Sequence, residues 1–198
     1  MDISGIAEKA KKCAFLIDEK KFDELIVDAG YADSFVYLFA VSLILLVFNL
    51  IVGVVRAQMA PSNVILSAAE MLLAVLVGVV LGWILNFVFL YLWAGFCHLL
   101  LKLLGGKAPL LKTVQVFIYG GTPSYLFSWI PLIGLLAYLL SLANVTIGIK
   151  RVHNISLLKA VLVTIIIPAA IICVIVVLAV MYFTASMTSL TTSLPVSS

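Results

Sequence analysis

The stretch NVILSAAEMLLAVLVGVVLGWILNFVFLYLWAGFCHLLLKLL, residues 63–104, decides the fold class of this protein. Glu70 and Lys102 are its only charged side chains. A helix needs about 20 apolar residues to cross a hydrocarbon core of about 30 Å, and this run would extend for about 60 Å as one helix. We therefore expect a membrane span here, either as one long helix that projects, tilts or bends, or as a helix with an interfacial piece.

The composition of the whole chain agrees with this membrane assignment. Of the 198 residues, 65% are hydrophobic and 11% are charged, whereas a soluble domain has about 45–50% apolar and about 25% charged residues. The sequence therefore predicts an all-α, polytopic integral membrane protein. A nucleic-acid partner is not expected, because basic loops beside membrane spans explain the positive net charge.

The acidic residues divide the chain near residue 33. Eight of the nine lie between Asp2 and Asp33, and only Glu70 follows. We expect a cytoplasmic amphipathic segment at the membrane interface over residues 1–33, and a flexible tail rich in Ser and Thr over residues 184–198. The membrane domain between them, residues 34–183, is predicted to form a bundle of five spans: residues 34–55, 63–104, 113–129, 131–149 and 156–183.

The basic residues predict an orientation. With five spans, Arg56 is the only Lys or Arg on one side of the membrane domain. The N-terminal segment shares the other side with Lys102, Lys107, Lys112, Lys150, Arg151 and Lys159. Because basic loops stay in the cytoplasm, we expect the N-terminus inside and the C-terminus outside. Two spans within residues 63–104 would undo this charge bias, so the bias favours one span there.

The N-terminal segment has the spacing of an amphipathic helix. Such a helix lies in the headgroup plane, where its lysines attract anionic lipids. Its simplest role is to anchor the first span, and recruitment of partners is the alternative. Around Phe22 and Leu25 the pattern predicts a second short helix. The apolar face of the first helix comprises Ile3, Ile6, Ala10, Cys13 and Ile17, and its lysines on the other side are Lys9, Lys11 and Lys12.

A stripe of small and polar side chains follows the long apolar run at every fourth position: Glu70, Ala74, Gly78, Gly82 and Asn86. Small residues let helices approach closely within a membrane, and we favour a partner helix of the same chain over a second copy. A carboxylate inside a membrane is read as functional by default. Glu70 is expected either at the interface, near a helix start at Ser62 or Asn63, or as a buried functional acid.

The fourth predicted span carries a second seam of small and polar residues. They recur at spacings of three and four, which suits left-handed packing against a neighbouring helix. The seam consists of Gly134, Ala137, Ser141, Asn144 and Gly148. We expect Asn144 to form a hydrogen bond across this interface.

Two further features carry polar or helix-breaking residues. Tyr119 and Pro123 frame a Gly-Gly-Thr sequence in the third span, and proline clashes with the carbonyl four residues earlier. We expect a kink there rather than a binding site. His98 is expected to form hydrogen bonds at the interface, and His153 to belong to a cationic loop. A metal site is not expected, because the remaining His and Cys residues lack ligand spacing.

From Lys102 onward, the sequence resembles the Yip1 domain family in several short motifs and in the order of these motifs. The features are Gly105-Gly106, Tyr119 with Pro123, Pro131 opening a span, Gly148 followed by Lys150–His153, and Lys159-Ala160. The resemblance implies five packed helices with a cytoplasmic N-terminus. In eukaryotes it implies membrane traffic in the Golgi and ER, binding of prenylated Rab-type GTPases, and complexes between family members. The Asp-Leu-Tyr-Gly-Pro motif of eukaryotic members is absent, which suggests a prokaryotic protein of the plasma membrane.

The sequence contains no catalytic motif such as G-x-S-x-G, H-E-x-x-H or a P-loop, so neither an enzyme nor a cofactor is expected. The leading hypothesis is a non-enzymatic adaptor or membrane-organising factor that acts through its cytoplasmic face. One alternative is a small transporter or channel, as a monomer or a homo-oligomer, that uses Glu70 and the broken third span. The other is a protein that binds or moves anionic lipids.

Overall fold

The computed structural model describes residues 3–14, 22, 24–25, 30–59 and 67–193, and side chains are described as far as residue 186. Within these residues the chain forms helices and no strand, which confirms the all-α class. The helices are α1 (Ile3–Ala14), α3 (Tyr31–Gln58), α4 (Ala68–Leu103), α5 (Leu110–Gly120), α6 (Thr122–Phe127), α7 (Ile133–His153), α8 (Leu157–Val161), the π-helical turn η1 (Leu162–Ile166) and α9 (Ile167–Ser193).

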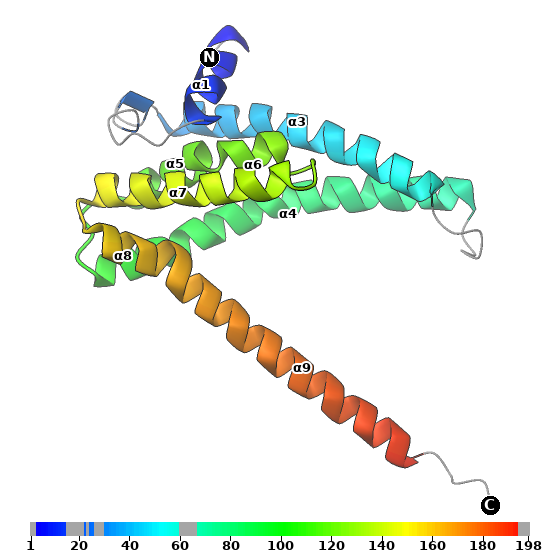
Figure 1. The fold of residues 1–198 in the computed structure, drawn as a ribbon. Helices are drawn as coiled ribbons and strands as arrows, with labels where there is room; N and C mark the ends of the chain where they lie inside the picture. Colours follow the sequence, from blue (N-terminus) through cyan, green and yellow to red (C-terminus); the bar gives the residue numbers. More distant parts are fainter. Residues whose placement is uncertain (1–2, 15–21, 23, 26–29, 60–66, 194–198) are drawn as a thin grey trace, which may run out of the picture.

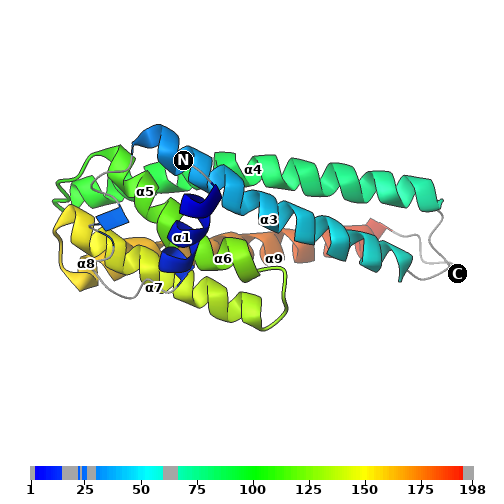
Figure 2. The same ribbon diagram turned by 90° about the horizontal axis from the view of Figure 1, so that it is seen from above.

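Among the described residues, four helices are long and apolar enough to cross a membrane: Tyr31–Gln58, Ala68–Leu103, Ile133–His153 and Leu157–Ser186. In Figure 1, α3 and α4 run side by side, and α5, α6 and α7 lie along one half of this pair. The last helix, α9, leaves the bundle at an angle (Figure 1). From above, α1 lies over α3, α5 and α6 (Figure 2), which it contacts.

The long apolar run folds as one continuous helix. Ser67 and Glu70 begin α4 with a capping box: the Glu70 amide donates to Ser67 Oγ, and the Ser67 amide donates to the Glu70 carboxylate. This reciprocal pair satisfies amides that lack partners at a helix start. The helix then continues for 36 residues, about 54 Å at 1.5 Å per residue. The expectation of one long helix is confirmed. Its N-cap is Ser67, and Ser62 and Asn63, where the start was expected, lie outside the described residues.

The third predicted span is two short helices. The chain breaks between Gly120, the last residue of α5, and Thr122, the first of α6. Pro123 lies in the first turn of α6, where its missing amide proton costs no helical hydrogen bond. A break therefore replaces the expected kink, and neither short helix is itself long enough to count as a span.

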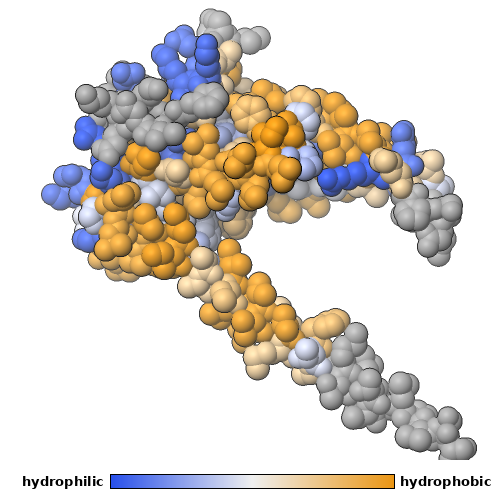
Figure 3. Space-filling model, viewed as in Figure 1, coloured by the Kyte–Doolittle hydropathy of each residue, from blue (hydrophilic) through white to orange (hydrophobic). Residues whose placement is uncertain are grey.

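The buried core occupies one half of the bundle. In α3 the buried residues lie between Ser34 and Ser42, and in α4 they lie between Leu90 and Leu101. The outer halves of these helices, residues 43–58 and 68–89, expose apolar side chains, as does α9 from residue 169 onward. Figure 3 shows this broad hydrophobic surface. Its extent fits a chain whose solvent is lipid.

The seam predicted on the fourth span lies within this core. All five of its residues are buried: Gly134, Ala137, Ser141, Asn144 and Gly148. Ser141 Oγ accepts hydrogen bonds from the amide and hydroxyl of Ser124 in α6. The expected bond of Asn144 is absent, because neither side-chain polar atom of Asn144 has a partner in the described part of the chain.

The last span begins with an irregular turn. The π-helical turn η1 comes directly before α9, in which Pro168 is the second residue. Because proline offers no amide proton to the preceding turn, the regular hydrogen-bond pattern cannot run through this point. The helix then continues to Ser193. The tail predicted from residue 184 is therefore helical as far as Ser193, and residues 194–198 lie outside the described chain.

Candidate functional site at the basic end of the bundle

The basic residues gather where α4 and α7 end and where α5 and α8 begin. We name this region the basic end; its residues are Lys102, Lys107, Lys112, Lys150, Arg151 and Lys159. Figure 3 shows hydrophilic side chains on this side of the molecule and around α1. The amino group of Lys159 donates to the Leu104 carbonyl at 2.8 Å, which ties α8 to the end of α4.

The two long helices finish at the basic end with the same capping geometry. Gly105 has φ 89°, and the amide of Gly106 donates to the Leu101 carbonyl at 2.8 Å. Asn154, with φ 51°, takes the equivalent position after α7. Glycine and asparagine are the residues that adopt this left-handed conformation at least cost. The chain can therefore turn sharply at both helix ends, which brings the two loops together.

A threonine between two histidines lies under these loops. Thr113 Oγ1 is 2.8 Å from His98 Nδ1 and 2.8 Å from His153 Nε2. Thr113 and His153 are fully buried. A Cβ atom on Gly106 would lie 2.6 Å from His153 Nδ1, so glycine is required for this close approach. The structure thus brings together two predicted residues, His98 and His153, and it buries His153 instead of leaving it in a cationic loop.

Thr113 has a single hydroxyl proton, so the hydrogen-bonding roles of the two imidazole rings depend on each other. A hydroxyl donates one hydrogen bond and accepts others. Thr113 therefore donates to one imidazole and accepts from an N–H of the other. This arrangement links α4, α5 and α7. It does not resemble a metal centre, because no group of three His, Cys, Asp or Glu side chains that could hold an ion occurs among the described residues.

A second polar cluster lies between α3, α5 and α6. Ser34 Oγ and the Tyr119 hydroxyl share a hydrogen bond of 3.1 Å, and the side-chain Nε2 of Gln115 donates to Ser34 Oγ at 3.0 Å. The hydroxyls of Tyr37 and Thr122 are 2.9 Å apart. All five residues are buried. Predicted residue Tyr119 therefore has a partner on α3, and Pro123 is buried beside this cluster at the start of α6.

The N-terminal helix packs its apolar face on this cluster. Cys13 is fully buried and makes polar contacts with the hydroxyls of Tyr37 and Thr122. Burial raises the pKa of the Cys13 thiol to about 11. Lys9 Nζ lies 5.7 Å from the centre of the Tyr119 ring, within the range of a cation–π interaction. The predicted apolar face of Ile6, Ala10 and Cys13 therefore contacts protein, so lipid contact is not needed to explain it. Ile17 and the side chain of Ile3, the other two predicted members of this face, lie outside what the structure describes.

The chain after α1 also contributes to the core. Phe22 is fully buried, and its ring touches the position of a Cβ atom on Gly148, at 2.8 Å. Gly148 belongs to the predicted seam on α7. The glycine is needed there because Val116 of α5 approaches the same point at 2.7 Å. The described residues of the N-terminal segment therefore pack as part of the bundle.

The other predicted residues lie away from the basic end. Glu70 is exposed, and its carboxylate accepts hydrogen bonds from Ser67 at the start of α4. It is a capping residue rather than a buried acid. Gly78, Gly82 and Asn86 are exposed, and a Cβ atom on either glycine would meet nothing within 4 Å. The expectation that this stripe packs on a helix of the same chain is wrong for both glycines.

Sequence reasoning missed most of the buried polar residues of the two clusters: Thr113, Ser34, Gln115, Tyr37 and Thr122. Thr113 and His153 are 40 positions apart, and Ser34 and Tyr119 are 85 positions apart. No local pattern marks such contacts. The available signal was weak: a threonine and a serine at the starts of two predicted spans, where a polar residue is ordinary.

Comparison with known families places the chain. The Yip1 domain matches residues 15–180, which include every helix from α3 to α8 and most of α9. Neither the curated proteins nor the solved structures that were searched gave a match. The family match and the long apolar helices identify a multi-pass integral membrane protein. The chain belongs to the Yip1 domain family.

Proposed function

We propose that this Yip1-domain protein is a non-enzymatic membrane adaptor that binds an acidic partner protein through its basic end and the outer face of α1. The observation that carries the proposal is that the helices are tied together most firmly in the half of the bundle that carries the basic end. The polar hydrogen bonds that link helices, together with α1, concentrate in the half of the bundle that carries the basic residues. This half therefore offers a preformed surface.

The surface combines fixed backbone with exposed charge. Lys11 and Lys107 are exposed, and Lys12 pairs with Glu8 at 2.9 Å on the same outer face of α1. A positive surface selects negative partners and speeds their encounter. By the distribution of Lys and Arg, the same surface faces the cytoplasm, where a trafficking-type partner, as the family suggests, would meet it.

The experiment is a crosslinked pull-down from native membranes with the full-length protein. The test variant carries Lys11→Glu and Lys107→Glu, which reverse two exposed charges and leave the core untouched. The matched control is Arg56→Gln, which removes a cation at the opposite end of α3. Truncation of residues 1–28 is a poor choice, because it deletes Cys13 and Phe22 from the core.

The proposal predicts that specific partners captured by the wild type are lost from the charge-reversal variant and kept by the control. Each variant is first shown to reach the membrane in wild-type amount. Capture of the same partners by all three proteins would contradict the proposal. So would equal loss from the charge-reversal variant and from Arg56→Gln.

A further inference from the structure

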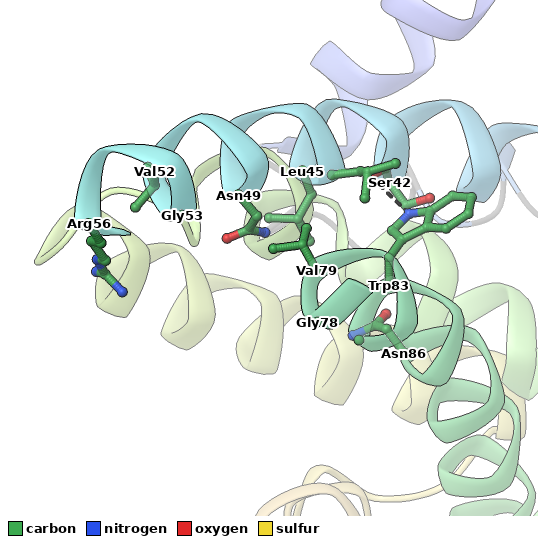
Figure 4. Close-up of a pocket in the computed structure, with 12 residues that line it drawn as sticks. Ser42, Leu45, Asn49, Val52, Gly53, Arg56, Gly78, Val79, Trp83 and Asn86 are labelled. Carbon is green, nitrogen blue, oxygen red and sulfur yellow. Dashed lines mark hydrogen bonds between the residues drawn. The ribbon is translucent and has the colours of Figure 1, made fainter. Parts of the chain in front are cut away.

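A groove lies between the outer halves of α3 and α4, at the opposite end from the basic end (Figure 4). Its volume is about 380 Å³. Asn49 and Arg56 line it from α3, and Gly78, Gly82, Trp83 and Asn86 line it from α4. None of these residues belongs to the adaptor surface proposed above.

The groove is hollow because of its glycines. Gly53 brings the two helices into contact, since a Cβ atom on it would lie 2.7 Å from a methyl group of Val75. Trp83 Nε1 donates to the Ser42 carbonyl at 3.2 Å and holds the helices together farther along. Between these ties, Gly78 and Gly82 leave open space.

Three polar side chains lie in this groove without partners. Figure 4 shows Asn49 and Arg56 on α3 and Asn86 on α4 beside the hollow. In the described part of the chain, no hydrogen bond or ion pair joins these three side chains to another residue. Figure 3 shows hydrophilic atoms interrupting the hydrophobic surface over α3 and α4. A polar group in lipid without a partner is costly, so an occupant that supplies acceptors would stabilise the groove.

We propose that this groove binds one anionic phospholipid. The guanidinium of Arg56 offers forked donors that match phosphate oxygens, and it lies two residues before the end of α3, where headgroups meet a spanning helix. The carboxamide of Asn49, seven residues before Arg56 on α3, can donate to an ester carbonyl oxygen that follows the phosphate in a diacyl lipid. Apolar side chains of the same groove, including Leu45 and Val79, contact the acyl chains.

Charge favours this occupant over a second copy of the chain. A second copy packed on the groove by two-fold symmetry would bring a second Arg56 to the first. Among residues 43–58 and 68–89, which form the outer halves, the acidic residue is Glu70, and its carboxylate already accepts hydrogen bonds from Ser67. The copy would therefore add positive charge without a free carboxylate, whereas a phosphate neutralises Arg56.

Native mass spectrometry of the purified full-length protein tests the proposal. The protein in detergent is titrated with phosphatidylglycerol and, separately, with phosphatidylcholine. We expect the wild type to retain one phosphatidylglycerol and to prefer it over phosphatidylcholine by at least tenfold. Arg56→Gln should lose that preference. Gly82→Leu, which fills the hollow and keeps the charge, should weaken retention by at least tenfold, and Asn49→Leu is the second groove variant if Gly82→Leu does not fold.

Lys107→Gln is the matched control, because it removes one cation at the basic end. Equal retention of the two lipids by the wild type would overturn the proposal, as would an effect of Lys107→Gln as large as that of Arg56→Gln. Competition by millimolar inorganic phosphate would overturn it in favour of a free anion site. A wild-type dimer that Gly82→Leu dissociates without a change in lipid retention would show that a second copy fills the groove, and would overturn the proposal.

Discussion

At the scale of single residues, the bundle depends on a few buried polar atoms that reach across helices. Thr113 is the clearest case, because one hydroxyl serves both His98 and His153. A buried polar atom that loses its partner pays its full desolvation cost. The contribution of Thr113 therefore lies less in its own two bonds than in the unpaired imidazoles that its removal would leave.

Replacing Thr113 with valine should destabilise the protein. The change keeps the shape of the side chain but leaves His98 Nδ1 and His153 Nε2 without a partner. We expect a loss of about 1–3 kcal/mol in the free energy of unfolding, measured by SDS titration in mixed micelles. Thr113→Ser keeps the hydroxyl and should lose clearly less. A Thr113→Val protein as stable as the wild type would show that the hydroxyl bridge has no structural role.

The Cys13 thiol should react slowly in the folded protein. It is buried, and its pKa is raised from 9.0 to about 11, so at pH 8 the folded state holds less thiolate than the unfolded chain. In a protein with Cys97→Ala and Cys173→Ala, we expect maleimide to label Cys13 at least tenfold more slowly before unfolding than after it. The folded-state rate should rise as the pH approaches 11. Equal rates at pH 8 would mean that α1 does not cover this residue.

The raised pKa of Cys13 also predicts how the stability of the fold depends on pH. The unfolded chain releases the thiol proton near pH 9, before the folded protein does. Ionisation of Cys13 therefore favours unfolding above about pH 9, and it leaves stability unchanged at lower pH. A Cys13→Ala variant should lack this alkaline component, which unfolding measured at pH 8 and pH 10 would show.

At the scale of elements, glycine placement separates the packed faces from the open ones. Gly148 on α7 faces Val116 and the ring of Phe22 at distances that leave no room for a methyl group. Gly95 on α4 faces open space, and so do Gly78 and Gly82 of the same helix. The same residue type therefore has opposite roles in two helices of the bundle.

Matched alanine substitutions should expose this difference. Gly148→Ala forces Val116 or Phe22 to move, and overpacking of this kind costs about 1–3 kcal/mol. Gly95→Ala meets no atom and adds helix propensity, which is worth up to about 1 kcal/mol in favour of folding. Unfolding of both variants in mixed micelles provides the measurement. Destabilisation by Gly95→Ala equal to that by Gly148→Ala would contradict the described packing of α7.

The helices differ in how far the sequence predicts them. The length of α4 and the buried seam of α7 follow from local patterns, because apolar length and small-residue spacing are properties of one helix. The glycines and proline around Gly121 predict an interruption of the helix, but sequence alone does not show whether flanking helices support a kink or a break. The packing of α1 and Phe22 depends on contacts with distant residues, so their spacing predicted an amphipathic helix but not the surface that covers it.

At the scale of the whole molecule, the fold constrains the path of the chain through the membrane. The loop at Gly106 touches His153, so the chain between them leaves the basic end and returns to it. The segments α5–α6 and α7 must therefore both cross the membrane or both remain short of the far side. The first case gives the five spans that we propose, with α5–α6 as a broken crossing, and the second gives three. In both cases α9 ends on the side opposite the basic end.

The central claim is that the basic end faces the cytoplasm, where it meets its partner. Labelling of intact cells with a membrane-impermeant maleimide tests this claim most directly. Single cysteines are introduced as Lys107→Cys, Met59→Cys and Leu132→Cys, in a Cys173→Ala background because Cys13 and Cys97 are buried. All three positions are exposed on the protein.

The account predicts labelling at positions 59 and 132 in intact cells, and labelling at position 107 only after permeabilisation. Protection of position 132 in intact cells would reduce the five proposed spans to three without moving the basic end. Labelling of position 107 in intact cells would place the basic end outside and contradict the proposed adaptor role.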